Sequence, residues 1–78
     1  MTYQVEVTDT YAGEANYNWV HKHTIDMPEG YSKRQLVMAA KKAEGWTGRR
    51  CETYHHGDMI EVRPRGLLQV MFITWIDK

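Results

Sequence analysis

Four histidines are the residues of this 78-residue chain whose type and spacing could support metal chemistry. His21 and His23 share one face if their segment is a strand, and His55 and His56 lie beside the glycine of a tight turn. If the two segments were neighbours, three imidazoles could gather around zinc or another divalent metal. No H-x-x-x-H or C-x-x-C spacing supports such a site, so we expect half-exposed sheet histidines, no metal and no cofactor.

Cys51 is the single cysteine and the only candidate for a thiol nucleophile. Arg49 and Arg50 precede it and two histidines follow, which is the kind of surrounding that an activated thiolate needs. Alternation places Cys51 on one strand face with Thr53 and His55, which favours a buried structural thiol. The chain also lacks a nucleophile elbow, a phosphate-binding loop and a dinucleotide fingerprint. We therefore expect no catalytic residue and no enzymatic activity.

Composition is typical of one small globular domain. Hydrophobic residues make up 42% and charged residues 26%, with ten basic and ten acidic side chains. A net charge of zero argues against a bulk electrostatic binder of nucleic acid. Residues 1–31 carry one basic and five acidic side chains, whereas residues 32–65 carry eight basic and four acidic ones. With no signal peptide, no apolar run of about 20 residues and one cysteine, a cytoplasmic protein without a membrane partner is expected.

The elements that position these residues begin with two predicted strands, at residues 3–8 and 17–25, which are joined by a predicted loop at 9–16. Ser32 and Gln35 form the capping box of a predicted helix, and Gly45 lies where a left-handed residue ends it. The apolar stripe of this helix is small, so it predicts a close approach to the sheet. The stripe consists of Leu36, Ala39, Ala40 and Ala43.

Three further strands are predicted after the helix. They cover residues 49–56, 59–63 and 67–76, with turns at His56-Gly57-Asp58 and Pro64-Arg65-Gly66. The order is β-β-α-β-β-β. Residues 1–78 therefore form a single α+β domain with an antiparallel sheet of about five strands and one helix on one face.

The last predicted strand is apolar on both faces, and one alanine-lined helix can cover only one of them. Either two copies pack their sheets together as a homodimer, or a partner supplies the cover. Alternatively, the N-terminal hairpin or the 9–16 loop folds across the second face. That second face is expected to carry either Leu67, Met71, Ile73 and Trp75 or the alternate set, Leu68, Val70, Phe72 and Ile76.

Three segments carry a resemblance to known proteins. They are VTDTYAGEANYNWV at 7–20, KKAEGWTG at 41–48 and GDMIEVRPRG with VMFITW between 57 and 75. In this order they resemble a group of small proteins encoded by phages, prophages and bacterial genomes, over most of the chain. The resemblance brings no catalytic residue. It implies a phage protein that inhibits a host defence complex by direct binding, as anti-CRISPR proteins do.

The expected contacts with such a protein target are exposed charged and aromatic side chains. The alternative is a nucleic-acid-binding accessory protein, whose basic helix and strand surface would hold phosphates while Trp19, Trp46 and Tyr54 stack on bases. Zero net charge makes this alternative the weaker one. The expected partner-binding residues are Glu14, Asn16 and Tyr17 near the first loop, and Arg49, Arg50, Arg63 and Arg65 on the basic side.

Overall fold

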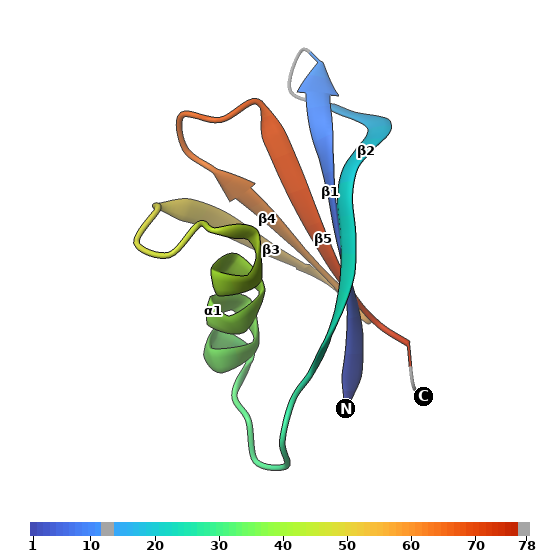
Figure 1. Cartoon of the computed structure of the whole chain (residues 1–78), viewed down its shortest axis with the longest axis vertical. Coiled ribbons are helices and arrows are strands. Elements are labelled where there is room, and N and C mark those ends of the chain that lie inside the picture. The colour runs from blue at the N-terminus through green and yellow to red at the C-terminus, as the bar shows by residue number, and fades with distance from the viewer. Residues whose placement is uncertain (12–13, 77–78) are drawn as a thin grey trace.

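A computed structural model describes the backbone of residues 1–11 and 14–76, and the side chains of residues 1–10 and 21–76. Five strands and one helix follow each other in the predicted order (Figure 1). The elements are β1 (Thr2–Tyr11), β2 (Glu14–Asp26), α1 (Lys33–Glu44), β3 (Cys51–His56), β4 (Met59–Pro64) and β5 (Gln69–Trp75).

The strands form one antiparallel sheet in the order β2-β1-β5-β4-β3. This confirms the predicted α+β class, with a single helix on one side of the sheet (Figure 1). The C-terminal strand β5 is central, between β1 and β4, because it pairs along its length with both. Strand β2 and strand β3 are the two edges, and α1 connects one edge to the other.

The first hairpin differs from the prediction, because most of the expected 9–16 loop is strand. Thr10 pairs with Ala15 and Tyr11 with Glu14, while residues 12–13 lie outside the described residues. The register of β1 on β2 shifts between Val7 and Thr8 and again before Thr10. Such bulges break the alternation of side chains without ending the pairing. This segment therefore shows no period in the sequence although it is hydrogen-bonded as a strand.

Helix α1 has the predicted ends. The Gln35 N–H donates to Ser32 Oγ at 3.1 Å, and the Ser32 N–H donates back to Gln35 Oε1 at 2.8 Å. Gly45 adopts a left-handed φ of 79° and closes the last turn. The predicted apolar stripe is only partly right: Leu36 and Ala40 are buried, whereas Ala43 is exposed. Val37 packs against the core in its place.

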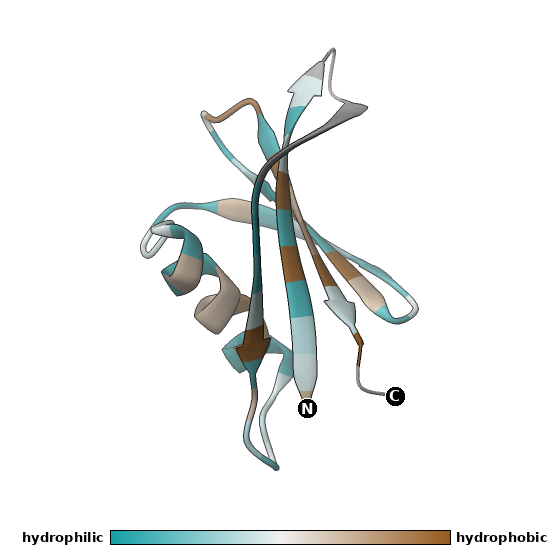
Figure 2. Cartoon of the chain, turned by 45° about the vertical axis from the view of Figure 1, so that its right-hand side comes forward, coloured by the Kyte–Doolittle hydropathy of each residue, from teal (hydrophilic) through white to brown (hydrophobic). Residues whose placement is uncertain are grey.

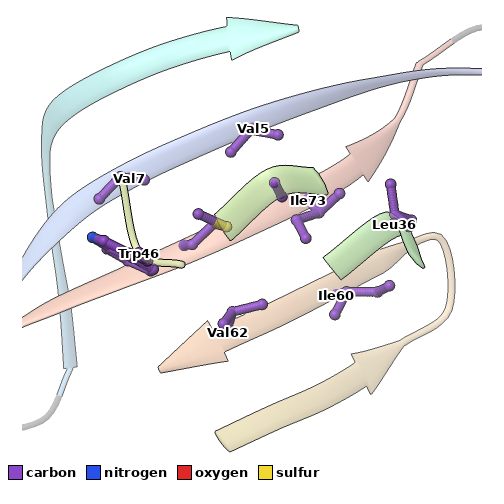
Figure 3. Packing of buried hydrophobic residues seen from close by; sticks show 9 residues of the cluster. Val5, Val7, Leu36, Trp46, Ile60, Val62 and Ile73 are labelled. Atoms are coloured by element: carbon purple, nitrogen blue, oxygen red, sulfur yellow. The ribbon is translucent and has the colours of Figure 1, made fainter. Parts of the chain in front are cut away.

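The core lies between α1 and the face of the sheet that α1 covers. Figure 3 shows side chains from β1, β4 and β5 pointing toward the helix and toward Trp46, which follows it. Along β1 the apolar and polar residues alternate, visible as brown and teal bands in Figure 2. This alternation places the apolar side chains of β1 on one buried face. The buried cluster consists of Val5, Val7, Leu36, Ala40, Trp46, Ile60, Val62, Met71 and Ile73.

No helix within residues 1–11 and 14–76 has the length and apolar character needed to cross a membrane.

Candidate functional site

Five cationic side chains gather at one end of the sheet, which we call the basic end. They come from the last turn of α1, the connection into β3 and the turn between β4 and β5. Three of the four predicted contact arginines are among them, and two lysines of the helix join them. The basic end consists of Lys41, Lys42, Arg49, Arg50 and Arg65.

Hydrogen bonds to backbone carbonyl groups tie the three segments of the basic end together. Lys41 Nζ donates to the Arg49 carbonyl oxygen at 2.6 Å, and Arg49 Nη1 donates to the Arg65 carbonyl oxygen at 3.2 Å. The Arg65 N–H donates to the Arg50 carbonyl oxygen at 2.9 Å, which extends the β3–β4 pairing by one position. The cationic groups of Lys41 and Arg49 are therefore held by backbone carbonyl groups rather than by acidic side chains.

The charge of the basic end is not neutralised by neighbouring acids. Within the described part of the chain, no carboxylate lies within 4.0 Å of any of its five cations. Glu44, on the same helical turn, points away from them and contacts His21 Nδ1 at 2.7 Å. The negative end of the helix dipole, worth about half a charge, offsets part of the positive charge. Such a surface attracts anions.

Arg63 does not belong to the basic end. It lies on the sheet face opposite α1, which we call the open face, where its Nε is paired with Glu61. His56 Nε2 contacts the same carboxylate at 3.2 Å. The sequence placed Arg63 with the other arginines because it is only two residues from Arg65. Its pairing with Glu61 within β4, and the turn that begins after Pro64, separate it from Arg65.

The open face is not the apolar patch expected from the last strand. Met71 and Ile73, which were expected to need a second cover, are fully buried under α1. On the open face β5 presents Val70, which is also fully buried, and the half-buried Phe72. Polar and charged side chains from the neighbouring strands surround these two. They include Gln4, Glu6, Lys22, Glu61 and Arg63.

The described residues therefore give no support to a dimer through an uncovered apolar face of β5. The exposed large hydrophobic side chains of the described residues are scattered over several elements. They do not form a contiguous apolar surface on β5, so another feature must carry any proposal for self-association. The exposed side chains are Met1, Met38, Tyr54, Leu68 and Ile76.

The other predicted contacts are placed as follows. Glu14, Asn16 and Tyr17 belong to β2, and the structure describes only the backbone of these three residues. Trp46, which was expected to offer a ring for stacking on bases, is only 5% exposed and belongs to the core. Tyr54 remains exposed on the open face, where its hydroxyl donates to Glu52 Oε2 at 2.9 Å.

The histidines cannot gather in the way the metal hypothesis required. His21 and His23 lie on β2, whereas His55 and His56 lie on β3, at the opposite edge of the sheet. The hypothesis needed the two strands to be neighbours. Cys51 is half-buried against the core, and its Sγ donates to the Arg49 carbonyl oxygen at 3.5 Å. The prediction of a buried thiol is therefore right only in part.

A pocket of about 280 Å³ lies at the end of the sheet opposite the basic end. It is formed between the start of α1, the start of β1 and the β3–β4 turn. The rings of Tyr3 and Tyr31 meet edge to face at 5.9 Å, and their hydroxyl groups are hydrogen-bonded to each other. The volume lies just below the range usual for small-molecule sites. Its lining is Tyr3, Tyr31, Lys33, Leu36, His55, Gly57, Asp58, Ile60 and Trp75.

The lysines are the part of the basic end that the predicted contacts missed. The sequence does contain a signal for Lys41 and Lys42, since two adjacent basic residues in a last helical turn interact favourably with the helix dipole. Their position beside Arg49 and Arg65 depends on where the helix ends over the sheet. The chain matches no protein-family model, no curated protein and no solved structure, so its resemblance to phage proteins stays a prediction.

Proposed function

We propose that this protein acts by direct binding and inhibits a bacterial defence complex, in the manner of an anti-CRISPR protein. The basic end is its main contact surface. The observation that carries this proposal is the set of five cations that no described carboxylate neutralises. In a chain with zero net charge, such local concentration of charge is a property of one surface rather than of the whole molecule.

The geometry of the basic end fits an anionic macromolecular surface. Arg49, Arg50 and Arg65 are exposed, and guanidinium groups bind carboxylates and phosphates through two parallel hydrogen bonds. Nucleic-acid-guided defence complexes hold phosphates along their guide and target strands, and acidic protein surfaces offer carboxylates. Either surface would complement the basic end. Arginine is also among the residues in which binding energy concentrates at interfaces.

A nucleic-acid-binding accessory protein is the second candidate, and the same cluster of cations favours it. Phosphate binding by Lys and Arg gives an affinity that falls steeply with salt. The structure provides less for base stacking than the sequence predicted, because Trp46 is buried in the core. Tyr54 is exposed but lies on the open face of β3. We therefore favour a protein complex as the target, rather than free nucleic acid.

Self-association through the sheet is a further part of the proposal about partners. An uncovered apolar face does not support this self-association. It is the exposed edge strand β3, whose residues from Glu52 to His56 are all exposed.

The test uses a double substitution that removes two charges from the basic end. Lys42→Gln with Arg50→Gln changes two exposed side chains that form no side-chain hydrogen bond within the described part of the chain. We expect at least tenfold weaker inhibition of a reconstituted CRISPR nuclease that the unmodified protein inhibits. The measurement is cleavage of a labelled target against inhibitor concentration.

The matched control is Lys33→Gln with Arg34→Gln, which removes the same charge from the other end of α1. This variant should inhibit like the unmodified protein. Equal inhibition by both double variants would refute the placement of the contact surface. If the unmodified protein inhibits none of a set of reconstituted CRISPR nucleases, the proposed function is refuted. Salt-dependent binding to a generic DNA duplex or single strand, lost only in the Lys42/Arg50 variant, would support the second candidate instead.

A further inference from the structure

Strand β3 is an edge strand without the usual protection against pairing with another chain. It ends the sheet, and five of its six residues are exposed. Natural edge strands are blocked by charged side chains, lysine above all, by prolines, by bulges, by shortness or by a covering element, and β3 carries only one such charge, Glu52. The sequence of β3, CETYHH, contains no lysine and no proline, and its pairing with β4 is regular from Cys51 to His56. It offers a straight template for a further strand.

The other edge of the sheet is protected. Strand β2 is bulged twice against β1, and it carries Lys22 at an exposed position. Its His21 also contacts Glu44 of α1 at 2.7 Å, so the helix and this edge strand are joined. The contrast between the two edges restricts any added strand to β3.

Pairing within the β3–β4 hairpin determines which backbone groups of β3 point outward. Pro64 has no N–H and lies opposite Cys51, so this is a pair without mutual hydrogen bonds. The Arg65 N–H donates to the Arg50 carbonyl oxygen, so the neighbouring pair, Arg50 with Arg65, is a hydrogen-bonded one. Hydrogen-bonded and non-bonded pairs alternate in an antiparallel ladder. The N–H and C=O groups of Thr53 and His55 therefore point to the free edge.

No partner is found for these outward groups. Neither Thr53 nor His55 takes part in any hydrogen bond beyond the ladder within the described part of the chain. Both side chains are exposed, so α1 does not cover this edge. Figure 3 agrees, since the helical segments lie over β5 and β4 and leave β3 outermost.

We infer that the occupant of this edge is β3 of a second copy, paired antiparallel about a two-fold axis at Tyr54. This specifies the self-association that is part of the proposed function. In this register Thr53 pairs with His55 of the second copy by mutual hydrogen bonds, and His55 pairs with its Thr53. The two sheets become one continuous sheet of ten strands, with both helices on the same side.

Side-chain complementarity selects this register. Glu52, Tyr54 and His56 share the open face because they alternate along β3. Pairing about Tyr54 places each Glu52 opposite His56 of the other copy, and it places the two Tyr54 rings together. Such acid–base and aromatic cross-strand pairs stabilise antiparallel strands. The pairing also leaves Tyr54 opposite Tyr54 in a non-hydrogen-bonded position, where the side chains approach most closely.

Two alternative registers lie one residue away, about Thr53 and about His55, and both are less favourable. The register about His55 places Tyr54 opposite His56 of the second copy and pairs no acid with a base. The register about Thr53 has the same defect. It also satisfies the outward backbone groups, but it opposes Glu52 to Tyr54 of the second copy, whose hydroxyl already donates to its own Glu52 at 2.9 Å. It then pairs no acid with a base. The registers differ in which residue lies opposite the same residue of the second copy, at the two-fold axis. Disulfide crosslinking can measure this difference.

The experiment uses single cysteines in a Cys51→Ala background. Opposed Cα atoms of an antiparallel non-bonded pair lie about 4.5 Å apart, within the range of a disulfide. We expect Tyr54→Cys to form a disulfide-linked dimer under mild oxidation. Thr53→Cys should not, because its two copies would be displaced by two positions along the strands, roughly 7 Å. Sedimentation of the unmodified chain should show a dimer that Thr53→Pro weakens at least tenfold, since proline removes an outward N–H.

Each outcome decides the inference. Crosslinking at position 54 alone, together with the loss of the dimer in Thr53→Pro, supports it. Crosslinking at position 53 instead overturns the register. A dimer that crosslinks at neither position also overturns the register, and a chain that stays monomeric at about 1 mM overturns edge pairing altogether. These measurements use no defence complex and leave the basic end unchanged, so they fail or succeed independently of the inhibition assay.

Discussion

Leu36→Ala is the sharpest test of how this small domain is held together. Leu36 is 1% exposed and is the largest fully buried side chain that α1 contributes; the other buried helical residue is Ala40. Truncating a buried leucine to alanine typically costs about 2–5 kcal/mol, because transfer free energy is lost and a cavity remains. For a chain of this length the total stability is of the order of 4–12 kcal/mol. One substitution therefore removes a large part of it.

The expected loss is about 3 kcal/mol in the free energy of unfolding, and a fall in Tm of roughly 12–24 °C. Urea unfolding followed by tryptophan fluorescence measures the first quantity, with the buried Trp46 as a reporter of the core. Met38→Ala is the control, because Met38 lies on the same helix and is 58% exposed. We expect that control to change stability by less than about 0.5 kcal/mol. A loss below about 1 kcal/mol for Leu36→Ala, or equal losses in both variants, would refute the assigned packing of α1.

Two further predictions concern local hydrogen bonds. Ser32→Ala should lower the free energy of unfolding by about 1 kcal/mol, because the Gln35 N–H loses its acceptor at 3.1 Å. Ser32→Asp should retain most of that stability, since aspartate is also a good N-cap residue. Equal thermal stability of all three proteins would contradict the capping role of Ser32. Donation from Tyr54 to Glu52 raises the pKa of the Tyr54 phenol, so Glu52→Gln should lower that pKa in an ultraviolet titration at low protein concentration. Because the folded chain keeps this phenol neutral to higher pH than the unfolded chain does, the bond stabilises the fold at neutral pH and is lost as pH rises through the raised pKa. Superimposable titration curves for the two proteins would refute the assignment.

Local signals in the sequence predicted most of the secondary structure. The capping box at Ser32 and the glycine at position 45 depend on contacts within a few residues, and both helix ends were predicted correctly. The turn at Gly57 was predicted for the same reason, since a positive φ of 62° there suits glycine. The 9–16 segment was misread because bulges between Val7 and Thr10 disturb the alternation on which strand prediction depends.

The candidate site was predictable in part. Arg49, Arg50 and Arg65 were expected to act together, and they do lie together at the basic end. Arg63 was grouped with them too, but it lies within β4 and is paired with Glu61 on the open face, whereas Arg65 lies in the turn that follows the strand. Lys41 and Lys42 joined the cluster only because the helix ends above the start of β3.

By itself the sequence determined the class of fold, its element order and the ends of its helix, since these depend on short-range patterns of side chains. Only the tertiary structure decided which surfaces meet. It placed β5 in the centre of the sheet, with Met71 and Ile73 buried under α1 rather than free for a partner. It also separated the histidines of β2 and β3 to opposite edges and left the outward groups of Thr53 and His55 unpaired. These outcomes depend on strand order, which is set by contacts between residues far apart in the chain.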